Sequence, residues 1–290
     1  MGGCVGLLAG VLFLASPEAL GASSSLTNLA KAEQLFNRTD YDGAIRLLDP
    51  NSRESATNFL LGRAYFMTGD LKHSVDALTR ATAAQPSNSE YMDWLGRAYG
   101  KRAETGNPLL APSLASKARQ AFEKAVELNP HSIDALDDLF DYYLNAPAFL
   151  GGGYDKAAAV ANKIVSLDPG QGFYDKSKLD QKQHQTQLAE QHLRQSVSAA
   201  PAGVGHWVAL ARFLAFQGRI PESDATFAQA EKVSPGNPRI WLAQADVLVK
   251  QNRNLDQAKL LLTKYVQAPI TADDPPREEA FRLLKQAGGA

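Results

Sequence analysis

Apolar side chains recur at three- and four-residue spacing along most of the chain, in short segments divided by polar turns. The stretch from Asn58 to Pro86 shows the pattern: two such segments flank the turn Thr68–Asp70, and Pro86 follows the second. This spacing places the apolar side chains on one face of a helix, and glycine and proline mark where helices end. The pattern therefore predicts an all-α chain built from pairs of antiparallel helices.

One of these helix pairs is repeated. The pentamer Leu61–Tyr65 (LGRAY) recurs as Leu95–Tyr99, 34 residues later, at the same place in the pattern. A fixed period of this length indicates stacked copies of one helical unit. Each unit leaves an apolar face that only the next unit can cover, so we expect an elongated stack rather than independent hairpins.

Both copies carry a glycine inside the first helix, Gly62 and Gly96. Glycine costs about 1 kcal/mol relative to alanine in a helix interior, so the two positions need a compensating contact. We expect the missing Cβ to let the second helix approach closely, with Ser74 and Ala118 as the small residues opposite.

The positions of the large and small residues resemble the tetratricopeptide repeat (TPR), a 34-residue helix hairpin. A later copy carries the family's residue types at the same offsets: Trp207, Leu210, Ala211, Leu214, Gly218, Ser223, Phe227, Ala230 and Pro235. The resemblance implies a right-handed α-solenoid of about six or seven helix pairs over residues 26–270, followed by a capping helix at 275–287.

Two repeats are longer than the others, since extra residues separate their two helices. The additions lie around 104–113 (ETGNPLLAPS) and 145–155 (NAPAFLGGGYD). The second contains the glycine run 151–153. A phosphate-binding loop requires a preceding strand, and the segment here is helical, so we interpret the run as a hairpin loop.

The remaining sequence carries no recognisable chemistry. It has no GxSxG, HExxH or Walker-type motif. His184 and His192, if they share a helix, lie about 12 Å apart, too far to bind one metal ion. We therefore predict no catalytic residue, no cofactor and no metal site, and no enzymatic activity.

Charge and the N-terminus limit the partners. The 30 Lys and Arg nearly balance the 31 Asp and Glu, so no strong field attracts nucleic acid. Residues 1–22 contain an apolar run followed by Pro17 and small residues near Ala22, as in a signal peptide. A short membrane anchor is the alternative. We expect an exported protein, in the periplasm or cell envelope or, alternatively, secreted, whose only membrane attachment is through residues 1–22.

In the TPR family, the inward face of the first helix of each pair contacts ligands. The resemblance implies a concave groove lined by Arg63, Phe66, Arg97, Lys101, Asp137, Asp141, Arg212 and Phe216. Its charge would change from basic to acidic and back to basic. A groove with arginine and aromatic side chains suits a protein or peptide segment.

Two functions remain open. The chain is either a non-enzymatic scaffold that binds a protein segment in this groove, or a structural subunit or assembly factor of an envelope complex. Secretion, pilus and exopolysaccharide machinery are examples of the latter. The second function would use the convex face or the inserted loops, so the two predict different contact surfaces.

Overall fold

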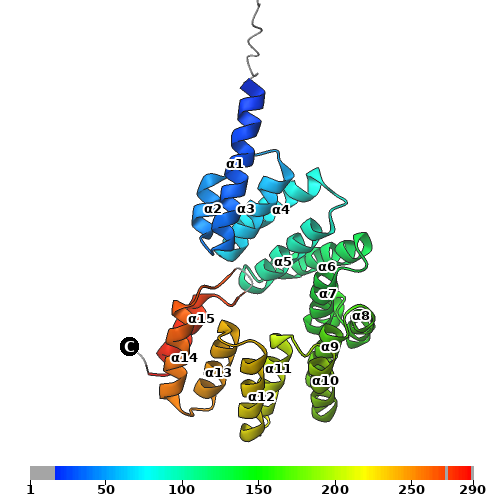
Figure 1. Cartoon of the computed structure of the whole chain (residues 1–290). Helices are drawn as coiled ribbons and strands as arrows, with labels where there is room; N and C mark the ends of the chain where they lie inside the picture. Colours follow the sequence, from blue (N-terminus) through cyan, green and yellow to red (C-terminus); the bar gives the residue numbers. More distant parts are fainter. Residues whose placement is uncertain (1–16, 272–273, 289–290) are drawn as a thin grey trace, which may run out of the picture.

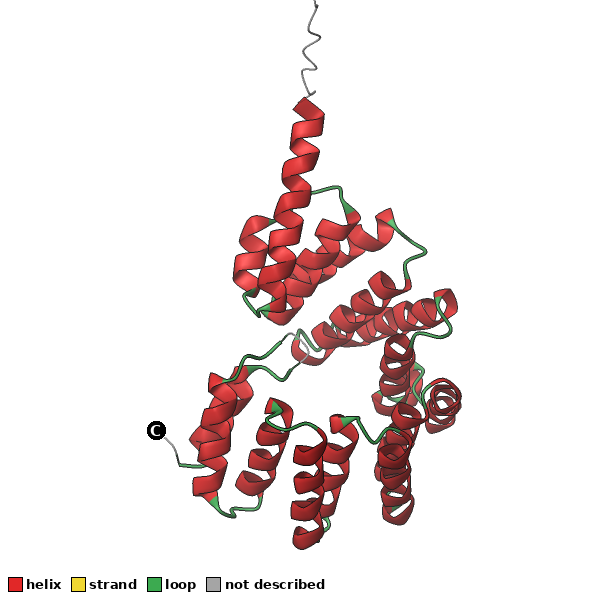
Figure 2. Cartoon of the chain, viewed as in Figure 1, coloured by secondary structure: helices red, strands yellow, loops and turns green. Residues whose placement is uncertain are grey.

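The computed structural model describes residues 17–271 and 274–288 (Figure 1). These residues form fifteen α-helices and one short 3-10 helix, with no strand among them, as Figure 2 shows. The helices are α1 (Pro17–Asn37), α2 (Tyr41–Leu47), α3 (Ser55–Met67), α4 (Leu71–Ala84), α5 (Ser89–Thr105), α6 (Ala111–Leu128), α7 (Ile133–Asn145), η1 (Ala148–Leu150), α8 (Tyr154–Leu167), α9 (Pro169–Lys182), α10 (Thr186–Ala199), α11 (Val204–Phe216), α12 (Ile220–Val233), α13 (Pro238–Lys250), α14 (Leu255–Gln267) and α15 (Arg277–Gln286). The predicted all-α repeat fold is confirmed.

The helices are arranged in two layers. Consecutive helices pack as hairpins from α1/α2 to α13/α14, and α15 packs on α13 and α14. Each odd-numbered helix also contacts the next odd-numbered helix, whereas within the described part of the chain no even-numbered helix contacts another. The odd-numbered helices therefore form one continuous layer on the inside of the curve, and the even-numbered helices lie outside it (Figure 1).

Side chains at the ends of the helices set their limits. Six residues cap the N-terminal backbone amides of the following helix: Asp40, Asp70, Asn88, Ser132, Asp168 and Asn237. Each accepts a hydrogen bond from a backbone amide of the first turn, for which the helix itself offers no acceptor. Gly69 and Gly218 occupy equivalent turns inside two hairpins with φ of 81° and 75°, a conformation that favours glycine.

The two helical glycines make room for large side chains, and this corrects our expectation. A Cβ at Gly62 would lie 2.4 Å from Leu78, and one at Gly96 would lie 2.6 Å from the Phe122 ring. The residue opposite Gly96 is therefore Phe122 and not Ala118. The Ser74 hydroxyl contacts the backbone instead, donating a 2.8 Å hydrogen bond to the Gly62 carbonyl.

The fifth hairpin joins the fourth without a linker. Asp168 is both the last cap of α8 and the first cap of α9, and its carboxylate accepts from the Gln171 amide at 3.0 Å. The turn after α9 contains His184, with φ of 59°, so His184 and His192 do not share a helix. His192 is half-buried, with its Nδ1 2.6 Å from Asp180, and is therefore not the solvated residue that its polar surroundings indicate.

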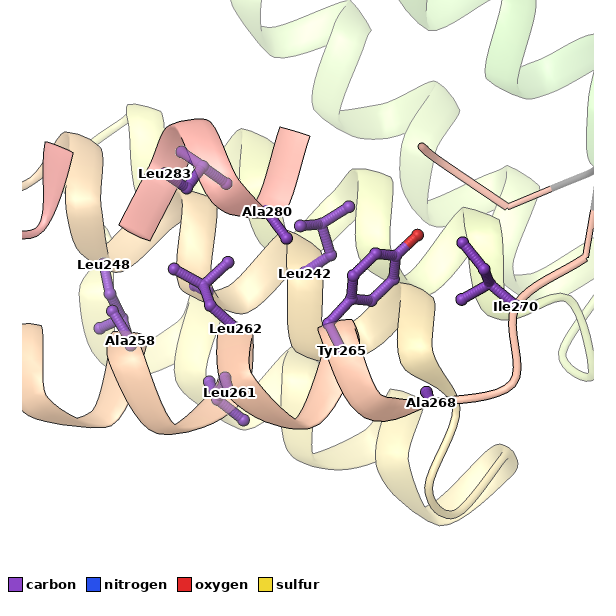
Figure 3. Close-up of a cluster of buried hydrophobic side chains, with 11 residues drawn as sticks. Leu242, Leu248, Ala258, Leu261, Leu262, Tyr265, Ala268, Ile270, Ala280 and Leu283 are labelled. Atoms are coloured by element: carbon purple, nitrogen blue, oxygen red, sulfur yellow. The ribbon is translucent and has the colours of Figure 1, made fainter. Parts of the chain in front are cut away.

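The last helix closes the apolar face of the seventh hairpin. Figure 3 shows Ala280 and Leu283 of α15 over Leu262 and Tyr265 of α14. The Tyr265 hydroxyl donates to the Pro275 carbonyl, which fixes the segment that leads into α15. A terminal helix of this kind shields core side chains that a further repeat would otherwise cover.

Residues 1–16, which hold most of the predicted signal peptide or anchor, lie outside the described residues. Over the part of the chain that is described, no helix combines the length and the apolar character that crossing a membrane requires.

Candidate functional site

The charged residues expected in the groove do lie on the inner helices, but most are paired across them. Arg97 of α5 contacts Asp93 of its own helix at 3.0 Å and Asp138 of α7 more closely. On the other side of α7, Lys178 of α9 lies 2.7 Å from Asp141. These contacts hold three successive inner helices together.

A second ion-paired cluster lies further along the groove. Arg212 of α11 contacts Asp246 of α13 at 2.7 Å, and Lys250 contacts the same carboxylate at 3.0 Å. The expected change of charge along the groove is therefore present but largely neutralised in place. Arg97 is ion-paired with two acids, whereas Asp246 is ion-paired with two cations.

Acids outnumber cations around α7. Lys178 also lies 3.4 Å from Asp137 and 3.3 Å from Asp175, so three carboxylates share one ammonium group. Burial, with the nearby Asp138 carboxylate, raises the pKa of Asp93 to about 8, and burial, with the nearby Asp137 carboxylate, raises that of Asp175 to about 8. Part of the excess negative charge near α7 is therefore removed by bound protons at neutral pH.

A large cavity opens beside this acidic cluster. It has a volume of about 740 Å³ and lies between α5, α6, α7 and η1. The residues that line it are Phe66, Trp94, Arg97, Gly100, Lys101, Ala103, Glu104, Pro108, Ala111, Pro112, Ala115, Phe122, Asp138, Asp141, Tyr142, Asn145, Ala146, Pro147 and Leu150. Phe66 and Trp94 meet edge to face at 5.6 Å, which gives the cavity an aromatic wall.

Both inserted segments line this cavity. The first lengthens helices rather than forming a long loop: α5 has 17 residues and α6 has 18, against 13 and 14 in α11 and α12. The second forms η1 and the glycine run after it. Since all odd-numbered helices run in one direction, the two insertions emerge at the same edge of the solenoid and contact each other through η1 and α6.

The glycine run does not offer its amides to a ligand. The amides of Gly151, Gly152 and Gly153 donate to the carbonyls of Ala148, Pro147 and Tyr143 at 2.9, 3.2 and 2.9 Å. A phosphate-binding loop needs such amides to be unoccupied. The run is a hairpin loop, as predicted, and its hydrogen bonds fix the rim of the cavity.

Comparison with known proteins agrees with the repeat pattern. Residues 209–275, which run from within α11 to the segment after α14, match the tetratricopeptide-repeat family. Residues 209–275 are therefore tetratricopeptide repeats. A search among curated proteins gave no match.

Two solved structures of TPR proteins show the same fold as this chain. A TPR protein of Parabacteroides merdae is 16% identical with a TM-score of 0.58, over 92% of this chain and all of that one. A thermophilic TPR protein of Thermus thermophilus is 19% identical with a TM-score of 0.54, over 66% of this chain and 98% of that one. TPR proteins are in general non-enzymatic scaffolds for protein or peptide partners.

The eight residues predicted to line the groove fall into separate groups. Phe66, Arg97, Lys101 and Asp141 line the large cavity. Asp137 lies beside it under Lys178. The other three residues lie elsewhere.

Arg63 is half-buried among aromatic rings, 4.6 Å from the centre of Phe36 and 4.9 Å from that of Trp94. Arg212 and Phe216 line a second cavity of about 280 Å³ near α9 and α11. A further cavity of about 260 Å³ is lined by Arg212 and Asp246 between α11 and α13. The described part of the groove therefore contains separate cavities with ion-paired residues among them.

The sequence interpretation missed Trp94, Asp138, Tyr142, Lys178 and Asp246. A usable signal existed for the acids and the lysine. Arg212 and Asp246 are 34 residues apart, one repeat length, whereas Arg97–Asp138 and Asp137–Lys178 are each 41 apart, across a lengthened repeat. Opposite charges at one repeat spacing would have indicated pairs between adjacent inner helices.

One Ser–His pair outside the groove has its hydrogen bonds in the wrong direction for a catalytic nucleophile. The Ser196 hydroxyl is fully buried and donates its single proton to the Gly170 carbonyl at 2.7 Å. His206 Nδ1, 2.8 Å from the same oxygen, must therefore donate rather than accept. A catalytic base would have to accept that proton.

Proposed function

We propose that this protein is an exported, non-enzymatic scaffold that binds a segment of a partner protein in its concave groove. The cavity between α5, α6, α7 and η1 carries the proposal. Its aromatic and aliphatic lining comes from the inner helices together with α6 and the first insertion, and it lies beside charged groups that can orient a bound chain. A rigid row of inner helices keeps these contacts in place before binding.

Photo-crosslinking in the native compartment tests this function. A benzophenone amino acid is placed at Lys101 or Phe216, on inner helices, and at Gln120 or Gln229, which are exposed on outer helices. We expect the same partner to be attached from the inner positions and not from the outer ones. Attachment from the outer positions alone would contradict binding in the groove.

A second function is favoured by the inserted loops. Leu109 and Phe149 are 88% and 81% exposed at the tips of the two insertions, and large apolar side chains at such exposure are typical of contact surfaces. A subunit or assembly factor of an envelope complex would use these tips. Leu109→Ser and Phe149→Ser would then abolish association while crosslinks from Phe216 remain unaffected.

Export rests on residues 1–22 and has its own test. Cleavage after Ala22 would leave a mature chain that begins at Ser23, which the mass of the intact protein from the envelope fraction measures. A mass that retains residues 1–22 together with membrane association would instead indicate the short anchor.

A further inference from the structure

The chemistry of the large cavity narrows the class of partner. Its apolar part consists of Phe66, Trp94 and Phe122 from the inner and outer helices, with Pro108 and Pro112 from the first insertion. Aromatic and proline side chains present flat apolar surfaces and lose little rotational freedom on binding. An aromatic or branched aliphatic side chain of a partner fits this part of the cavity.

The polar part of the cavity is acidic. Asp138 and Asp141 face it from α7, while Lys101 and Glu104 on its other side lie 3.3 Å apart and neutralise each other. Arg97 is the remaining cation in the lining, and it already serves two carboxylates. The lining therefore holds three carboxylates against two cations, and Lys178 behind Asp141 is shared among three acids, so a cation is the complementary group.

The side chains behind the lining point to the same deficit. Asp93 is only 3% exposed, and its Oδ1 atom has no hydrogen-bond partner. Asp175, fully buried beside Lys178, has an unpartnered Oδ2. Buried carboxylate oxygens normally find a donor, so the chain supplies fewer donors here than its carboxylates need, and the protons bound by Asp93 and Asp175 offset only part of that deficit.

The rim is held in shape before any partner arrives. The Tyr142 hydroxyl donates to the Leu150 carbonyl at 2.9 Å, and the Lys156 ammonium donates to the Gly151 carbonyl at 2.9 Å. Together with the occupied glycine amides, these bonds anchor the loop that displays Phe149. A preorganised rim reduces the entropy lost when a partner binds.

We propose that this cavity binds a partner segment in which a lysine or arginine lies close to an aromatic or branched aliphatic side chain. The apolar side chain enters between Trp94 and the prolines, and the cation reaches Asp138 and Asp141. This inference rests on the proposed function, since it names the chemistry of the segment that the groove would hold.

Selection from a displayed library of random peptides tests the inference on the purified full chain. We expect enriched peptides to combine Lys or Arg with Phe, Trp or Leu. Ala115→Phe, which fills the cavity from α6, should weaken their binding about tenfold or more, which corresponds to about 1.4 kcal/mol. Gln120→Phe places the same ring on the exposed side of α6 and should bind as the wild type does. Circular dichroism and thermal melting verify that both variants are folded.

The charge requirement has a separate readout. Replacing the basic residue of an enriched peptide by glutamine should weaken binding about tenfold, and Asp141→Asn should remove most of that difference. Asp155→Asn, at an exposed position of α8, is the matched control.

Three results would overturn the inference: enriched peptides without a basic residue, peptides that bind Ala115→Phe equally well, or a selection that enriches nothing. If any of these results is obtained while Lys101 or Phe216 still crosslinks to a partner, the proposed function stands. Only the partner class named here is then ruled out.

Discussion

Hairpins α5/α6 and α11/α12 are copies of one repeat that differ in two respects. The first contains Gly96 against the Phe122 ring, whereas the second has Ala211 at the equivalent position and Phe227 as the corresponding aromatic residue. Arg97 lies between two acids, whereas Asp246, the partner of Arg212, lies between two cations. The regular copy follows the family pattern most closely, and the modified copy lines the large cavity.

This difference separates what a repeat needs for folding from what it offers for binding. Both copies bury their aromatic residue, with Phe122 at 6% and Phe227 at 2% exposure, so both satisfy the stacking requirement. The insertions in α5–α8 add surface at the edge of the stack without changing how the inner helices meet. Four experiments test this separation, from the largest expected effect to the smallest.

Overpacking the close hairpin should have the largest effect. Gly96→Leu places a side chain where even a Cβ would lie 2.6 Å from Phe122, and we expect a loss of about 3 kcal/mol in the free energy of unfolding. The matched change Ala211→Gly should cost about 1 kcal/mol, as for any helical glycine. Denaturant unfolding measures both, and equal effects would show that the two hairpins are equally close.

Removing the cation from each cluster should distinguish the two charge arrangements. Arg97→Met leaves Asp93 and Asp138 without a counter-charge, and we expect a loss of about 2 kcal/mol. Arg212→Met leaves Asp246 paired with Lys250 and should cost about 1 kcal/mol or less. Thermal melting compares the two, and a larger loss at Arg212 would contradict the comparison. Charge reversal at either arginine is accordingly a poor probe of partner binding.

The acid-rich cluster should make stability depend on pH. The pKa of Asp93 is raised from 3.8 to about 8 by burial, so the folded chain binds a proton that the unfolded chain has released between these values. Stability should therefore decrease as pH rises from about 4 to about 8. Asp93→Asn should flatten this slope, as melting at pH 5, 6, 7 and 8 would show. An unchanged slope would mean that Asp93 is ionised in the folded chain.

Removing residues 1–22 should have the smallest effect. Among the side chains of α1 that the structure describes, from Thr27 onward, Leu29, Ala32, Leu35 and Phe36 reach the core, and all lie beyond the predicted cleavage point. A chain that begins at Ser23 should melt within about 1 °C of the full chain, since surface and terminal changes away from the core contribute little. A drop of several degrees would show that the start of α1 supports the first hairpin.

The sequence predicted the repeat because its signal is local. Glycine, proline and apolar spacing at Gly62, Pro86 and Trp207 identify helix pairs without any knowledge of the neighbours. The predicted partner of Gly96 was wrong by one helical turn, and so was that of Gly62: the glycines face Phe122 and Leu78, each four residues after the small residue expected. The residue types identified the two helices, whereas their rotation against each other decided which turn makes the contact.

The site was only partly predictable for a related reason. Inward positions such as Phe66 and Lys101 follow from the register within one hairpin. The pairing of Arg97 with Asp138, and of Lys178 with three acids, depends on how far one hairpin is rotated against the next. That rotation arises from packing over the whole interface, so a single repeat contains little information about it.

Asp168 has a mechanical consequence. Because this one residue ends α8 and begins α9, the chain has no slack between the fourth and fifth hairpins. A twist applied to one half of the solenoid at this joint must pass directly into the other half, whereas a flexible linker would absorb it. The large cavity and the cavity lined by Arg212 and Phe216 lie on opposite sides of this joint, which keeps them at a fixed distance from each other. A partner long enough to occupy both would have to match that distance.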